Sequence, residues 1–348
     1  MSHLDRRTLL KAGAAGTGGL VVSSALGGVA EAGPPVARQV LARGLDIPWG
    51  LTFLPNGNAL VAERDSAVVH QVSRRGGKRS IGQVDNVRPS GEGGLLGLAL
   101  HPDFRRNRWL YAYITTANDN RVVRMRYAQG RLSDQRLVLA GIPRSTIHNG
   151  GRLRFGPTGH LFVATGDAGN TSNAQDLGSL GGKILRLTDT GEVPGDNPFG
   201  GNPVWTFGHR NVQGLSFDNR GRLWATELGQ NTRDELNRIV RGHNYGWPVV
   251  EGGDGPGGDY HDPVATWRPT STCSPSGLAV VGRHGWVGAL AGESLYRVTL
   301  RGSRRGRKRR FFEGTFGRLR TVEKSPDGSL WITTANGSGD RVIRVKLG

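Results

Sequence analysis

The sequence has almost no cysteine: Cys273 is the only one in 348 residues. A single thiol cannot form a disulfide within the chain, so the fold must be held by packing. The same scarcity excludes zinc and iron–sulfur sites that are built from several cysteines.

Long apolar runs are absent beyond the amino terminus. The first 32 residues contain the pair Arg6-Arg7, an apolar run diluted by glycine and alanine, and the small-x-small sequence Ala30-Glu31-Ala32. This order resembles a cleaved twin-arginine export signal, whereas a membrane anchor, the alternative, needs a longer uninterrupted apolar stretch. We therefore expect a signal peptide at 1–32, a mature domain at 33–348, and export to the periplasm, the cell envelope or the medium.

Acidic residues are scarce relative to basic ones, with 28 Asp and Glu against 46 Lys and Arg and a net charge of +18. Seven of the ten residues in RGSRRGRKRR (301–310) are basic. A nucleic-acid site is one interpretation of such a run. Since the run lacks interleaved aromatic residues and no nucleic-acid motif lies nearby, we expect no nucleic-acid partner. An electrostatic contact with acidic envelope polymers is the favoured interpretation.

Helical periodicity is also missing from the mature chain, whereas glycine is abundant, at 56 residues. One pattern, a small or apolar strand, a turn and a second alternating strand, recurs six times, at 48–65, 94–115, 150–167, 212–229, 275–298 and 318–337. In the third copy Leu161 and Val163 face one way and Phe162 and Ala164 the other. Six such units predict an all-β, six-bladed β-propeller. The alternative, a pair of β-sandwiches, does not require the same strand pair six times.

Loops that flank the inner strands of a propeller converge on the mouth of its central channel. Five such loops carry polar groups: GEGGLLG (91–97), HNGGRL (148–153), GHRNVQGL (208–215), ELGQNTRDELNRIVRGHNYGWP (227–248) and FGRLRTV (316–322). Each has a purely structural interpretation, since a loop histidine, a braced arginine or a solvated Asp-Glu pair is common. Several arginines at one mouth favour an anionic ligand. Carboxylates with loop carbonyls and no cysteine favour calcium over zinc.

The order of these motifs, from about residue 40 to the carboxyl terminus, resembles the soluble PQQ-dependent sugar dehydrogenases, which include glucose, aldose and sorbosone enzymes. The most specific segments are GHRNVQGL and DELNRIVRGHNYGWP. The resemblance implies an exported quinoprotein that oxidises aldose sugars to lactones and passes electrons to an external acceptor that the sequence does not identify.

The resemblance also implies roles for individual positions. His148 matches the general base that takes the anomeric hydroxyl proton while hydride passes to PQQ, a role that suits an imidazole. Arg210, Asn211, Arg318 and Arg320 match residues that hold PQQ, and Arg318 and Arg320 are expected on one strand face. The carbonyls of Gly229 and Gln230 match calcium ligands, and Glu235 and Tyr245 (side chain or carbonyl) match ligands of a second calcium. Glu92 and Asp167 match positions near the sugar.

Three positions depart from the family pattern. Ala291 stands near a position where members often carry a PQQ-contacting lysine, and Arg297 is a candidate to replace its charge. Glu92 replaces a glutamine and Gln230 replaces a proline. The chain also lacks the long insertions of the dimeric glucose enzymes, so we expect a monomer.

Two alternatives remain open at this point. One is a calcium-dependent propeller lactonase, which would not need Arg210, Arg318 and Arg320 together. The other is a non-enzymatic propeller that binds glycans or envelope polymers, a possibility that the replacement at Ala291 favours and that His148 beside a complete Arg-Asn motif opposes.

Overall fold

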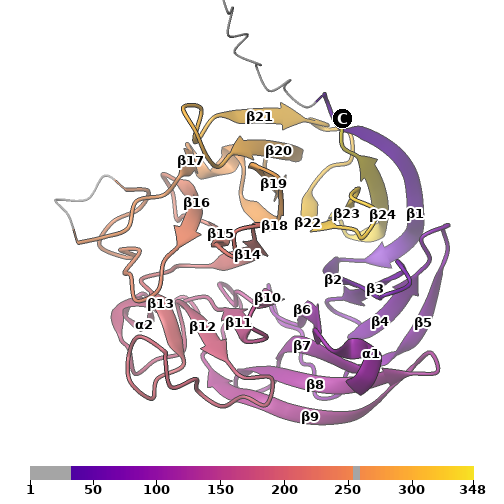
Figure 1. The fold of residues 1–348 in the computed structure, drawn as a ribbon, viewed down its shortest axis with the longest axis horizontal. Coiled ribbons are helices and arrows are strands. Elements are labelled where there is room, and N and C mark those ends of the chain that lie inside the picture. Colours follow the sequence, from indigo (N-terminus) through magenta and orange to yellow (C-terminus); the bar gives the residue numbers. More distant parts are fainter. Residues whose placement is uncertain (1–32, 254–258) are drawn as a thin grey trace, which may run out of the picture. The chain divides into compact units, whose positions relative to one another are not determined.

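Six four-stranded antiparallel sheets form a ring around a central channel (Figure 1). The structure is a computed structural model and describes residues 33–253 and 259–348. The prediction of a six-bladed β-propeller is confirmed. The predicted signal peptide lies outside the described residues.

The blades follow one another along the chain, with the innermost strand first. Blade 1 contains β2 (Pro48–Phe53), β3 (Ala59–Glu63), β4 (Val68–Val72) and β5 (Lys78–Gln83). Blade 2 contains β6 (Leu95–Leu100), β7 (Trp109–Thr115), β8 (Asn120–Ala128) and β9 (Arg131–Ile142). Blade 3 contains β10 (Leu153–Phe155), β11 (Leu161–Ala164), β12 (Lys183–Leu187) and β13 (Val204–Phe207).

The second half repeats the arrangement. Blade 4 contains β14 (Val212–Phe217), β15 (Leu223–Glu227), β16 (Asp234–Ile239) and β17 (Ala265–Trp267). Blade 5 contains β18 (Pro275–Val281), β19 (His284–Ala289), β20 (Ser294–Thr299) and β21 (Lys308–Phe311). Blade 6 contains β22 (Leu319–Lys324), β23 (Leu330–Thr334) and β24 (Ser338–Lys346), and its outermost strand is β1 (Val36–Asp46).

Strand β1 closes the ring, because the first described strand pairs with the last, Ala42 lying opposite Val342. Each of the six predicted repeats contains the two inner strands of one blade, and the fifth, 275–298, also includes most of β20. In residues 33–253 and 259–348, helical structure is limited to short connections, α1 (Phe104–Asn107), α2 (Ser172–Gln175) and a 3-10 turn, η1 (Thr270–Thr272). Within the described ranges no helix is long and apolar enough to cross a membrane.

The core lies between the blades rather than at the centre. Leu161 and Val163 belong to an apolar cluster shared with blade 2, whereas Phe162 and Ala164 belong to a cluster shared with blade 4. This division confirms the predicted alternation. Each blade thus buries both faces against its neighbours, as near-planar stacking around a channel requires.

Glycines let the inner strands approach one another around the channel. A Cβ atom on Gly97 would lie 2.2 Å from the carbonyl oxygen of Gly151 in the next blade, and one on Gly214 would lie 2.5 Å from the carbonyl oxygen of Ser276. Neither position can accept a side chain without moving backbone. This packing accounts for part of the glycine excess.

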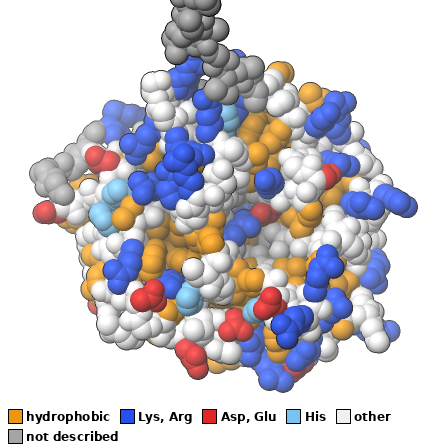
Figure 2. Space-filling model, in the orientation of Figure 1, with side chains coloured by type: hydrophobic (Ala, Val, Ile, Leu, Met, Phe, Trp, Pro, Cys, Tyr) orange, Lys and Arg blue, Asp and Glu red, His pale blue; other side chains and the backbone are white. Residues whose placement is uncertain are grey.

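The basic run 301–310 forms the turn before β21 and part of β21 itself, the outer edge of blade 5. Figure 2 shows Lys and Arg side chains gathered over this blade. Arg310 pairs with Glu313 at 2.6 Å, and Lys308 lies over the ring of Trp267. The run is therefore an exposed, charged sheet edge, a device that also opposes unwanted strand pairing.

Candidate active site

Loops before β6, β10 and β14 and the loop after β11 bring five of the predicted residues together. Gly166 and Asn211 form a bridge between blades 3 and 4, and the Asp167 amide donates to the carbonyl of Arg210 at 2.8 Å. The Ala168 amide donates to the carbonyl of His148 at 3.1 Å. Residues 19 to 119 positions apart in the chain thus share one small volume at the end of the channel.

His148 and Asp167 form the central pair of this site. The Nδ1 atom of His148 lies 2.7 Å from Asp167 Oδ1, and the two Asp167 oxygens also accept from Gly169 N (2.8 Å) and Trp247 Nε1 (2.8 Å). Burial alone would raise the pKa of Asp167, but these hydrogen bonds outweigh it and lower the pKa. Asp167 is therefore an ionised carboxylate that can only accept hydrogen bonds.

The conformation of the His148 loop is fixed from several sides. His148 has a φ of +54°, in the left-handed region that non-glycine residues rarely adopt. Its amide donates to Glu92 Oε2 at 2.9 Å. The same carboxylate oxygen accepts from Asn211 Nδ2 at 3.4 Å, while Asn211 Oδ1 accepts from Gly150 N at 3.0 Å. Glu92 and Asn211 thus hold the loop that presents the imidazole.

Arg210 stands beside this pair with its guanidinium over the ring of Trp247, at 5.5 Å. One guanidinium nitrogen donates to the carbonyl of Leu228 at 3.2 Å, and its amide donates to Glu227. Burial lowers the pKa of Arg210, opposed by the charges of Asp167 and Glu227. Its Nε atom is buried without a hydrogen-bond partner among the described residues.

Arg320 and Arg318 occupy different environments. Arg320 is buried in β22, where it donates to Gln213 Oε1 at 2.9 Å, and its Nε has no partner within the described part of the chain. Arg318 precedes β22 and is exposed. Arg318 and Arg320 were expected to share one strand face, but Arg318 lies just outside β22, which begins at Leu319. The register of β22 also shifts between Leu319 and Val322.

A third cation, Arg64, acts electrostatically on Arg320 and also pairs with Asp65 at 2.6 Å. Burial, together with the charges of Arg64 and Arg318, lowers the pKa of Arg320 to about 10, against the opposing charge of Glu92. Such crowding of guanidiniums, with unsatisfied buried N–H groups on Arg210 and Arg320, fits a ligand with several carboxylates. The residues present therefore fit PQQ.

The predicted calcium residues lie in and around blade 4. Gly229 and Gln230 follow β15, Glu235 lies on β16, and Tyr245 is buried. The Tyr245 hydroxyl donates to the carbonyl of Arg238 (2.7 Å) and accepts from Val240 N (2.9 Å), so it is occupied by backbone groups.

Carboxylates crowd the same region. Glu251 Oε1 accepts from the amides of Gln230 (2.7 Å) and Asn231 (3.1 Å). Burial raises the pKa of Asp234 to about 7, and burial together with the charge of Glu227 raises the pKa of Glu235 to about 8. Crowded hard oxygens that resist ionisation fit a bound divalent cation such as calcium. Among the described residues, no group of three or more His, Cys, Asp or Glu is placed to hold a metal ion.

Arg297 lies in a different environment from Ala291, the residue near the position of the family's lysine, whose positive charge Arg297 was a candidate to replace. Ala291 is exposed after β19, whereas Arg297 is buried on β20 with its guanidinium over the rings of Trp286 and Phe311. Arg64 is the additional cation that lies near Arg320.

Several residues of the site were not predicted. Trp247 donates a hydrogen bond to Asp167, and Gln213 accepts one from Arg320. The guanidinium of Arg152 lies 4.2 Å from the ring of Trp49 and donates to the carbonyl of Gln213 at 2.8 Å. Arg64 was also missed, although its position in the repeat could have indicated it. It directly follows the second strand of blade 1, and Asp167 lies in the corresponding loop of blade 3.

Fold and site together define a propeller enzyme whose channel mouth combines a histidine–aspartate pair with several guanidiniums. The chain belongs to the glucose/sorbosone dehydrogenase family, whose model matches residues 45–344. Its relatives place it among the soluble PQQ-dependent sugar dehydrogenases.

Three relatives illustrate this membership. The PQQ-bound aldose sugar dehydrogenase of Streptomyces coelicolor superposes with a TM-score of 0.87 and 46% identity, over 90% of this chain and 98% of that one. The aldose sugar dehydrogenase YliI of Escherichia coli is 32% identical over 87% of this chain and 91% of its own. Quinoprotein glucose dehydrogenase B of Acinetobacter calcoaceticus is 33% identical over 62% of this chain and 53% of its own.

Proposed function

We propose that the protein oxidises aldose sugars to lactones at the channel mouth, with PQQ and calcium as cofactors and His148 as the general base. The hydrogen bond of 2.7 Å between His148 Nδ1 and Asp167 Oδ1 carries this proposal. Removal of the anomeric hydroxyl proton and of the hydride on the same carbon converts a cyclic hemiacetal into a lactone.

The pair fixes the tautomer of the imidazole. Because Asp167 is ionised and can only accept, Nδ1 of neutral His148 carries the proton and Nε2 carries the lone pair. The side chain of His148 is 13% exposed, so Nε2 remains open to a ligand. His148 therefore takes the hydroxyl proton at Nε2, while Asp167 stabilises the imidazolium that forms.

Arg210, Asn211, Arg318 and Arg320 would hold PQQ, the arginines by pairing with its carboxylates and quinone oxygens. When bound, PQQ supplies the two-electron acceptor for the hydride. A polyanion would also relieve the repulsion among Arg320, Arg318 and Arg64 that the pKa of Arg320 reflects. The buried guanidiniums favour negative charge that develops on an oxygen beside them.

Calcium would be held by the carbonyls of Gly229 and Gln230, and a second, structural calcium by Glu235 and a group of Tyr245. Since the Tyr245 hydroxyl already bonds two backbone groups, its carbonyl is the proposed ligand. Glu92 and Asp167 would lie near the sugar, because both contact His148. Asp167 is fully buried and would act on the sugar through His148.

We further propose that the chain acts as an exported monomer that passes electrons to an external acceptor, and that the basic edge at 301–310 contacts acidic envelope polymers. Export rests on the twin-arginine-type leader. The polymer contact rests on the exposed, basic strand β21.

The test is dye reduction by the purified full chain with a panel of aldoses, with and without PQQ and calcium. We expect turnover only when both are present. It should be lost in His148→Ala while the absorbance band of bound PQQ persists. Bound PQQ without turnover on any aldose would contradict the proposal.

A further inference from the structure

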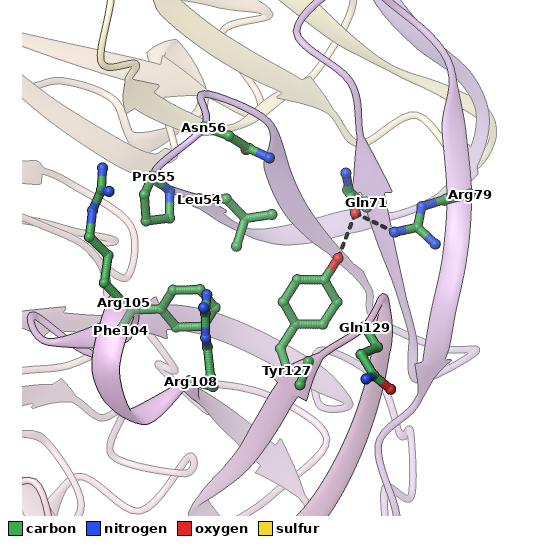
Figure 3. A pocket seen from close by; sticks show the side chains of 11 residues that line it. Leu54, Pro55, Asn56, Gln71, Arg79, Phe104, Arg105, Arg108, Tyr127 and Gln129 are labelled. Carbon is green, nitrogen blue, oxygen red and sulfur yellow. Dashed lines mark hydrogen bonds between the residues drawn. The ribbon is translucent and has the colours of Figure 1, made fainter.

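A pocket of about 720 Å³ lies between blades 1 and 2, at the face opposite the candidate active site. It is lined by the β2–β3 turn, the α1 segment and the end of β8 (Figure 3). The active-site residues, in contrast, lie before the inner strands or after the second strands. Because antiparallel strands alternate in direction, these two sets of connections lie at opposite ends of the blades.

Three arginines, Arg79, Arg105 and Arg108, line this pocket, and none of its described lining residues is Asp or Glu. Arg79 donates to Gln71 Oε1 at 2.8 Å, and Arg108 lies over the ring of Phe104 at 5.6 Å. In the part of the chain that the structure describes, none of the three forms an ion pair with a carboxylate. Guanidiniums without carboxylate partners at one concavity favour an anionic ligand.

The remaining walls combine aromatic rings with amides. The rings of Phe104 and Tyr127 lie 6.4 Å apart between centroids and nearly parallel, at 21°. Figure 3 shows the Tyr127 hydroxyl pointing at Gln71, and this contact is 2.5 Å long. Gln71 Oε1 thus accepts from both Tyr127 and Arg79, which leaves its Nε2 as a donor that neither contact uses. Asn56 and Gln129 add two more amides.

Rings, amides and guanidiniums together match the parts of an acidic sugar. Ring C–H faces pack on aromatic side chains, hydroxyls exchange hydrogen bonds with amides, and a carboxylate pairs with guanidinium groups. The volume is in the range typical of small-molecule pockets. Figure 2 also shows Lys and Arg side chains gathered over blades 1 and 2, which would attract such an anion.

We propose that this pocket binds a carboxylated saccharide, either as a free acid or as one unit of an acidic polysaccharide. This site is distinct from the candidate active site and does not depend on the proposed oxidation. It provides the chain with a second, non-catalytic carbohydrate contact.

The test is calorimetric titration of the full chain with methyl β-D-glucuronide, which has no free anomeric hydroxyl and so cannot be oxidised there. Methyl β-D-glucoside is the uncharged probe, and 2-naphthoate is an aromatic anion without hydroxyls. We expect the glucuronide to bind and the other two to bind at least about tenfold more weakly. Tighter binding of naphthoate or equal binding of the glucoside would overturn the assignment.

Matched variants locate the binding. The double variant Arg105→Gln/Arg108→Gln should weaken glucuronide binding about tenfold. Arg106→Gln changes an exposed neighbour on α1 that does not line the pocket and should leave binding unchanged. Equal losses in both, or none in the double variant, would show that general surface charge or another site binds the probe.

A trimer of galacturonate separates the two sources of the ligand. The glucuronide should bind in either case: a trimer that binds more weakly than the glucuronide assigns the site to single sugar acids, and a trimer that binds more tightly assigns it to a polymer unit. Binding of neither probe would overturn the proposal. Dye reduction by the double variant should equal that of the native chain. A failed dehydrogenase proposal would therefore leave this result intact, and the reverse also holds.

Discussion

Blades 3 and 4 each place a histidine before the inner strand and pair its Nδ1 with a carboxylate beyond or at the end of the second strand. In blade 3 the pair is His148 and Asp167, at 2.7 Å. In blade 4 it is His209 and Glu227, at 2.8 Å. The two pairs differ at the other ring nitrogen. Thr206 Oγ1 lies 2.9 Å from His209 Nε2, whereas within the described residues no group hydrogen-bonds to Nε2 of His148.

Their surroundings differ in the same sense. The His209 side chain is fully buried, at 0% exposure, and its ring stacks on Tyr245 at 4.6 Å. Glu227 also accepts a hydrogen bond from the Arg210 amide. The blade 4 pair therefore supports Arg210, which lies beside the blade 3 pair. Under the proposed function, one arrangement of residues would take part in the chemistry in blade 3 and give structural support in blade 4, and access to Nε2 separates the two.

The sharpest contrast comes from His148→Ala against His209→Ala. Loss of the base should lower kcat by about 10²–10⁴-fold. The other groups that bond Asp167, the Gly169 amide and the Trp247 indole, cannot accept a proton in place of His148. The free energy of unfolding of His148→Ala should fall by less than that of His209→Ala, since the ring is partly exposed and Asp167 keeps its hydrogen bonds from Gly169 and Trp247. Dye reduction and urea denaturation measure the two quantities. If His148→Ala kept turnover within tenfold of the native chain, the base assignment would be wrong.

Asp167→Asn tests the tautomer argument. One carboxamide orientation sets its NH₂ group against Trp247 Nε1–H. The other sets it against Gly169 N–H and lets it donate to His148 Nδ1, which leaves the imidazole proton on Nε2, the wrong tautomer for a base. We expect kcat to fall by up to about 10⁴-fold, because the imidazole is held in the wrong tautomer. Asp167→Ala is the control, since it removes the orienting group without reversing it and should retain correct tautomer more often than Asn does.

The same variant has a pH signature. Because hydrogen bonds lower the folded-state pKa of Asp167, its contribution to stability is present above the unfolded pKa of about 3.8 and is lost as pH falls through the lower folded value. The difference in unfolding free energy between native chain and Asp167→Asn should therefore be constant from about pH 5 to 8 and shrink below about pH 4. A difference that shrinks already near pH 6 would contradict an ionised Asp167 pair.

The sequence was sufficient for the repeat but not for the contacts that cross blades. Alternation at Leu161–Ala164 predicted which residues enter which core, because strand periodicity is local. His148, Arg210 and Asn211 could be predicted because they lie in the short motifs HNGGRL and GHRNVQGL, each of which leads into the inner strand of a repeat. Trp247 and Gln213 were missed, because their partners Asp167 and Arg320 lie 80 and 107 positions away. Likewise, the closure of blade 6 by β1 depends on the meeting of the two chain ends.

His209→Ala should act mainly on stability. It removes a fully buried ring and leaves the Glu227 carboxylate without one of its donors, which we expect to lower the unfolding free energy by about 2 kcal/mol. Turnover of the folded variant should fall less than in His148→Ala, since only the support of Arg210 is altered. His209→Ala with native stability but the kinetics of His148→Ala would show that the blade 4 pair is not a support.

Tyr245→Phe gives the smallest expected change and sharpens what supports His209. The ring that stacks on His209 remains, and only the hydroxyl between the Arg238 carbonyl and the Val240 amide is lost. Loss of these two hydrogen bonds should cost about 1 kcal/mol in urea denaturation, with turnover unchanged. The calcium concentration that gives half-maximal dye reduction should also stay the same, because the proposed ligand at this position is the Tyr245 carbonyl. A clear rise in that concentration would instead make the hydroxyl a calcium ligand and would tie the stacked His209 pair to the metal rather than to the backbone.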